Sequence, residues 1–222
     1  MPARDELAIA LAWQQHVDDD VGPSSVLERA INRYREPWRV YHGVGHLIRV
    51  VQAIDEVVRD APATAIHDRG TVVAAAVFHD AVYEPGRVDN EAASAALALR
   101  ELTTLPGWTP ERAARVAAMI EHTAGHRQCD DGPDTDVLIA ADLAILAASP
   151  ARYAEYCTGI RREYPDADDD AWAAGRSTVL RNFLDREAIF PVRLGLTSWE
   201  HRARANMTAE IASLAATGSA TS

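Results

Sequence analysis

Four residues of metal-binding type stand in segments of the chain where a polar side chain is out of place. His79 and Asp80 close the most apolar helical stretch of the sequence, His46 opens another apolar segment, and Asp142 interrupts the apolar run 139–146. A carboxylate in such a run must be paired with an opposite charge or bound to a cation. Taken singly, a histidine on a helix is more often a hydrogen-bonded structural residue than a ligand, and a buried aspartate is commonly an N-cap or the partner of an arginine. Together, imidazoles and carboxylates with open positions suit one divalent metal, namely Mn, Fe, Co, Ni or Zn, and also Mg.

The elements that must hold these residues in place read as helices along the whole chain. Apolar residues recur at helical spacing, whereas alternating strand patterns and Asn-Gly hairpin turns are missing. Caps, prolines and glycines divide the pattern into segments. The expected helices cover residues 7–17, 23–36, 47–58, 71–79, 89–102, 109–123, a segment holding Asp142, 149–164, 168–190 and 198–214. The sequence predicts an all-α protein, with a single compact domain of nine or ten helices over residues 1–217 and a flexible tail over 218–222.

The composition narrows the classes of function. The 222 residues are enough for about one domain. A formal net charge of −11 argues against non-specific binding to nucleic acid or to anionic membranes. All 22 basic residues are arginine, which excludes Schiff-base lysines, phosphate-loop lysines and Ser-Lys pairs. The sequence has only two cysteines, Cys129 and Cys157, no apolar leader, and no apolar stretch of about 18 residues, so we expect a cytoplasmic protein with free thiols.

Short motifs surround the four residues. They are Tyr41–His46, Phe78–Tyr83, Asp89–Glu91 with Ser94, Ala140–Leu143, Ile160–Tyr164, Gly175–Arg176, and Glu200 with Ala203, Arg204 and Asn206. In this order, over roughly residues 38–210, the chain resembles the HD-domain superfamily of metal-dependent phosphohydrolases. It is similar to a bacterial group of that superfamily whose substrate is generally unassigned. The resemblance implies a helical domain of HD type, in which the metal ligands are His46, His79, Asp80 and Asp142.

The resemblance also implies roles for residues around the metal. The catalytic candidates are Asp80, His122, Glu84 and Glu91, and the substrate-binding candidates are Arg39, His42, His126 and Arg161. Relatives that hydrolyse nucleotide monophosphates or alarmones carry an acid one turn after the His-Asp pair, and Glu84 and Glu91 are the acids near that place. For Arg39 and Arg161, an ion pair with one of the 33 acidic residues explains the arginine at least as well as binding of substrate phosphate does.

His122 and His126 stand four residues apart, a spacing at which two helical residues face one site. Members of the superfamily with two metals place the additional histidines on separate elements, so a second metal is left open here. Without a second metal, one of the two histidines contacts the substrate. His122 is preferred because the helix is expected to end near residues 123–125.

The predicted function is that of a divalent-metal-dependent phosphohydrolase acting on a phosphorylated small molecule, with nucleotides among the candidates. Two alternatives stay open. One is a di-iron oxygenase on the same fold, which needs the additional histidines at a second metal. The other is a non-catalytic sensor module that binds metal and nucleotide. The expected partner is the small-molecule substrate, with no nucleic acid and no membrane, and a homodimer is left open.

Overall fold

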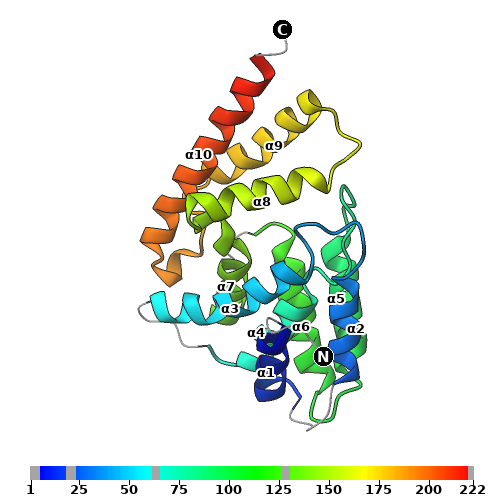
Figure 1. The fold of residues 1–222 in the computed structure, drawn as a ribbon. Helices are drawn as coiled ribbons and strands as arrows, with labels where there is room; N and C mark the ends of the chain where they lie inside the picture. The colour runs from blue at the N-terminus through cyan, green and yellow to red at the C-terminus, as the bar shows by residue number, and fades with distance from the viewer. Residues whose placement is uncertain (1–5, 19–23, 62–65, 127–130, 220–222) are drawn as a thin grey trace.

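The computed structural model describes residues 6–18, 24–61, 66–126 and 131–219, and all regular structure in these ranges is helical (Figure 1). The α-helices are α1 (Glu6–His16), α2 (Ser25–Arg33), α3 (Val44–Asp60), α4 (Arg69–Phe78), α5 (Asn90–Leu102), α6 (Pro110–Thr123), α7 (Pro133–Asp142), α8 (Pro150–Arg162), α9 (Asp169–Leu184) and α10 (Thr197–Ser219). Two short 3-10 helices join them, η1 (Leu143–Ala147) and η2 (Val192–Leu194). The prediction of one compact all-α domain with nine or ten helices is confirmed.

Side-chain caps fix where several helices begin. The side-chain oxygens of Ser24, Asp68, Thr109 and Asp168 each accept a hydrogen bond from the main-chain N–H three residues later. Such bonds satisfy N–H groups that have no partner inside the helix. Because the same residues mark helix starts in the sequence, α2, α4, α6 and α9 begin close to where the sequence places them.

Helix α4 is the centre of the fold. Residues 70–78 are all buried, as the apolar sequence of this segment predicts. Helices α1, α2, α3, α5, α6 and α7 pack against it. Figure 1 shows α8, α9 and α10 gathered together beyond α3 and α7, and α10 packs against η1 and α9. Because α4 is surrounded, the polar residues that follow it lie inside the molecule.

Helix α9 ends at Leu184, whereas the sequence pattern predicts an end at residue 190. The reason lies in α10. The carboxylate of Glu200 accepts hydrogen bonds from the main-chain N–H groups of residues 189–190. The guanidinium of Arg204 donates to three carbonyls in the segment 184–187. Since these main-chain groups find partners outside a helix, the chain leaves the helical path after Leu184.

The remaining expectations concern the tail, the cysteines and membrane segments. Helix α10 continues to Ser219, past the expected start of the tail, and residues 220–222 and Cys129 lie outside the described residues. Cys157 is a free thiol, and burial raises its pKa to about 12. Within the described ranges, no single helix is long and apolar enough to cross a membrane. The one pair that meets the criteria of length and composition, residues 133–147 with 150–162, is bent by 101°.

Candidate metal centre

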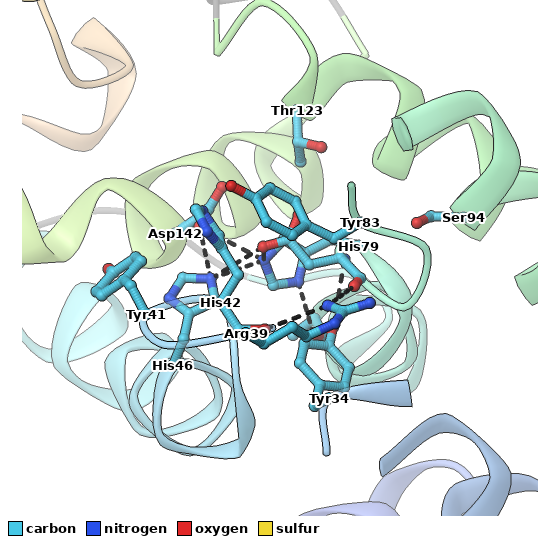
Figure 2. Close-up of polar contacts among 12 residues, drawn as sticks. Tyr34, Arg39, Tyr41, His42, His46, His79, Tyr83, Ser94, Thr123 and Asp142 are labelled. Carbon is cyan, nitrogen blue, oxygen red and sulfur yellow. Dashed lines mark hydrogen bonds and ion pairs between the residues drawn. The ribbon is translucent and has the colours of Figure 1, made fainter. Parts of the chain in front are cut away.

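Three helix ends bring the four predicted metal ligands together. His46 lies in the first turn of α3, His79 and Asp80 directly follow α4, and Asp142 is the last residue of α7. Figure 2 shows the side chains of His46, His79 and Asp142 turned toward one another. Residues from three separate segments of the sequence therefore form one cluster inside the molecule.

The donor atoms of this cluster are close to one another. The Nε2 atoms of His46 and His79 are 3.0 Å apart. Asp80 Oδ2 lies 3.3 Å and 3.2 Å from these two nitrogens, and Asp142 Oδ1 lies 3.3 Å and 3.5 Å from them. Donor atoms about 2.1 Å from one ion stand about 3.0–3.4 Å apart in octahedral or tetrahedral geometry. The observed spacing fits a shared cation, and His46, His79 and Asp80 form a group that could hold a metal ion.

The orientation of His79 also suits metal binding. Its Nδ1 lies 2.9 Å from the carbonyl oxygen of Ala76, one turn earlier in α4. With the proton on Nδ1, the ring donates to this carbonyl and directs the bare Nε2 into the cluster. Histidines that bind metals commonly have their second nitrogen held in this way. His79 therefore also has the second hydrogen bond, to the carbonyl of Ala76, that orients a metal-binding histidine.

Burial and mutual proximity shift the pKa values of the cluster. Burial raises the pKa of both Asp80 and Asp142, but the neighbouring histidines outweigh it and hold these pKa values well below the ordinary range. Burial lowers the pKa of His46 and His79, but the two carboxylates outweigh it and raise them. The carboxylates therefore stay ionised, with their charge balanced by protons on the imidazoles. A cation has to displace these protons, so we expect metal affinity to fall as the pH falls.

The structure places His126, and not His122, next to the cluster. His126 Nε2 lies 2.7 Å from Asp142 Oδ2, the carboxylate oxygen that the first two histidines do not contact. His122 Nε2 lies 3.8 Å from the carboxylate of Asp131, and 40% of its side chain is exposed. The preference for His122 at the centre is thus corrected. Helix α6 ends at Thr123, and the turn after it gives His126 a positive φ of 43°, so a helical spacing no longer relates the two histidines.

His42 stands at the edge of the cluster and is held by Glu163, a residue for which the sequence analysis predicts no role. His42 Nδ1 lies 2.7 Å from Glu163 Oε2, and the hydroxyl of Tyr83 donates to the same oxygen at 3.2 Å. The other oxygen, Oε1, accepts the main-chain N–H groups of residues 40–42 at 2.7 to 2.9 Å. Burial raises the pKa of Glu163, but these donors, His42 first, outweigh it and lower the pKa. An ionised carboxylate therefore orients His42, whose ring stacks on Tyr83 with centroids 4.0 Å apart.

Arg39 has a structural position rather than the predicted one in substrate binding. Its guanidinium is fully buried and donates to the carbonyl oxygens of His42, Asp80 and Ala81, and to the carboxylate of Glu36. These partners occupy its donors, so none is left to bind phosphate. The prediction for Arg39 is therefore corrected: it fixes the main chain on both sides of the cluster.

Replacing Arg39 by alanine is expected to lower the free energy of unfolding by about 3 kcal/mol, because it leaves buried carbonyls and Glu36 without their donor. The matched control is Arg161→Ala, since this guanidinium is partly exposed, its hydrogen bonds among the described residues go to residues 164–169, and its other neighbour is the ring of Trp172 at 5.4 Å. We expect it to cost about 1 kcal/mol or less. Urea unfolding followed by circular dichroism measures both. Equal costs in the two variants would contradict the structural role of Arg39.

The other predicted site residues lie away from the cluster. Arg161 donates to the carbonyls of Tyr164 and Ala167 in the segment after α8 and pairs with Asp169 at 3.0 Å, so its position does not support a phosphate role. The carboxylate of Glu84 is 64% exposed and faces Arg87 at 3.6 Å. Glu91 lies in the first turn of α5 and, among the described residues, makes no hydrogen bond or ion pair with the cluster. The structure therefore does not bring either acid to the centre.

Sequence reasoning missed arginines that do lie beside the centre. Arg49, Arg152 and Arg202 line a cavity of about 100 Å³ whose wall includes His46 and Asp142. Arg49 follows His46 by three residues in α3, a spacing that puts both on one face of the helix. The signal for Arg49 was therefore present in the sequence. Arg152 and Arg202 come from α8 and α10, and no local pattern marks them.

Comparisons of the chain with protein-family models, with curated proteins and with solved structures found no match. The fold and the site define the class of protein by themselves. It is an all-helical protein whose helix ends enclose a histidine–aspartate group that could hold a metal ion.

Proposed function

We propose that this protein is a divalent-metal-dependent phosphohydrolase of the HD-domain type, acting on a phosphorylated small molecule. The observation that carries the proposal is the convergence of His46, His79, Asp80 and Asp142, with the two imidazole nitrogens 3.0 Å apart and each carboxylate 3.2 to 3.5 Å from them. The order of these ligands in the chain, and the motifs around them, support the family. The metal is one of Mn, Fe, Co, Ni, Zn or Mg, because mixed imidazole and carboxylate ligands suit this group.

The residues around the cluster have separate tasks in this reaction. When bound, the divalent cation polarises a phosphoryl oxygen and brings the pKa of water near neutrality. His42 donates its Nδ1 proton to Glu163 and keeps a lone pair on Nε2, where it can accept a proton from water or substrate. The guanidinium groups of Arg49 and Arg152, in the cavity beside His46, bind the phosphate oxygens.

The other two functions have less support from the site. A di-iron oxygenase needs a second set of ligands, and the structure brings only His126 of the additional histidines close to the cluster. A sensor module needs the ligands but no turnover. The arginines in the cavity suit a phosphorylated ligand, which favours the phosphohydrolase and the nucleotide-binding sensor over the oxygenase, and turnover separates the first two.

The proposal is tested by phosphate release. The purified protein is stripped of metal, reloaded with each of the six metals in turn, and incubated with a panel of phosphate monoesters and anhydrides. We expect phosphate release that depends on metal, with one metal per chain by elemental analysis. Two irons per chain without phosphate release would support the oxygenase instead. One metal per chain with no turnover of any substrate would support the sensor module.

A further inference from the structure

Two adjoining cavities extend from the metal cluster to the surface. The inner cavity, of about 100 Å³, includes His46 and Asp142 in its wall. The outer one, of about 330 Å³, lies between α3 and α8. Both cavities are lined by Tyr41, Arg49 and Arg152, so they form one path that leads away from the cluster.

The arginines along this path have no acidic partner in the described part of the chain, although the sequence has 33 acidic and 22 basic residues. Among the described residues, Arg49, Arg152, Arg162 and Arg202 form no ion pair. The guanidinium of Arg49 lies over the ring of Tyr41 at 5.6 Å, and Arg202 donates one hydrogen bond, to a main-chain carbonyl. Most of their donor groups are therefore free to bind a ligand.

The charge of the path is positive apart from the metal ligand Asp142. Apart from Asp142, the charged residues that line the inner cavity are three arginines and one acid, Glu56. The charged residues that line the outer cavity are also three arginines and one acid, Glu155. Arg49 and Arg152 line both cavities. In a chain with net charge −11, this local excess of positive charge is the reverse of the overall balance. The planar guanidinium binds phosphate through two hydrogen bonds at once, so a row of arginines suits a row of phosphate groups.

We infer that this path binds a ligand with two or more phosphate groups. The position of the first phosphate rests on the proposed function. This phosphate lies at the metal cluster, where Arg49 and Arg152 bind it from the inner cavity. A second phosphate lies in the outer cavity, between Arg152 and Arg162. A substrate with a single phosphate uses only the inner half of the path and binds more weakly.

The test measures binding of inorganic tripolyphosphate and of inorganic phosphate to the full-length protein by isothermal titration calorimetry. We expect tripolyphosphate to bind more tightly than phosphate. Arg152→Ala and Arg162→Ala each raise its Kd by about 10-fold, because each removes a charge-assisted hydrogen bond. Both side chains are exposed, so the fold is retained, which circular dichroism verifies.

The matched control is Arg115→Ala, which removes an exposed arginine of α6 that lines neither cavity. We expect this variant to bind tripolyphosphate as the unchanged protein does. Equal weakening by all three variants, or no weakening by Arg152→Ala and Arg162→Ala, would overturn the inference. Binding that follows the expected pattern in a protein without phosphate release would overturn the proposed function alone. Metal-dependent hydrolysis of a phosphate anhydride with a KM that neither variant changes would support the phosphohydrolase and overturn the path, including the place of Arg152 in it.

Discussion

Replacing Asp80 by alanine is expected to abolish metal retention and metal-dependent phosphate release while the helical fold remains. The carboxylate faces both imidazole nitrogens at 3.2 and 3.3 Å, so its removal takes away one ligand and the charge that balances the cation. We expect metal affinity to fall by more than about 100-fold, which exceeds the effect of losing a residue behind a ligand. The main chain at this position keeps its bonds to Tyr34 and Arg39, which preserves the local fold.

Elemental analysis after gel filtration, together with phosphate release, measures this effect. The matched control is Asp55→Ala, which removes a carboxylate of α3 that pairs with Arg69 on the surface. We expect the control to retain one metal per chain and full activity. Full metal occupancy in the Asp80→Ala protein would show that Asp80 is not a ligand.

Replacing His126 by alanine is expected to weaken metal binding by about 10- to 100-fold, whereas replacing His122 leaves it unchanged. His126 holds the outer oxygen of Asp142 at 2.7 Å and so fixes the orientation of the oxygen that faces the cluster. Losses of this size are typical when the partner behind a metal ligand is removed. Among the described residues, His122 pairs with the carboxylate of Asp131 at 3.8 Å and makes no hydrogen bond or ion pair with the cluster, so it serves as the matched control.

Titration of the stripped proteins with Mn²⁺ or Zn²⁺ gives both the affinity and the stoichiometry. We expect one metal per chain in the unchanged protein and in both variants. A stoichiometry of two that falls to one in either variant would instead show that the histidines bind a second metal. Equal affinities in all three proteins would contradict the supporting role of His126.

The fold and the ligand cluster could be predicted because their signals are local. Side-chain caps such as Asp68 mark helix starts through bonds that reach three residues along the chain. His79, Asp80 and Asp142 stand out because polar residues in apolar helices need a partner, whatever the fold. The structure places these residues together with His46, in agreement with that reasoning.

The residues around the ligands could not be predicted in the same way, because their positions depend on packing between distant segments. Arg39 stands next to a motif in sequence, yet its guanidinium points into the protein and binds carbonyls of the segment after α4. Arg152 reaches the cavity because α8 packs against η1. The sequence favours His122 because the helix is expected to end near residues 123–125, and α6 does end at Thr123, but the turn after it brings His126 and not His122 to Asp142.

The segment before α3 has a consequence for how this protein can recognise an anion. Residues 40–42 point three consecutive main-chain N–H groups at one oxygen of Glu163. Consecutive N–H groups of this kind form a nest, the concave main-chain site in which many proteins bind phosphate. Here the carboxylate of Glu163 already occupies the nest, and its hydrogen bonds link the end of α8 to the segment before α3. The glycine-containing segment 41–46 therefore cannot serve as a phosphate loop, and the proposed function leaves recognition of a phosphate to guanidinium groups and the metal.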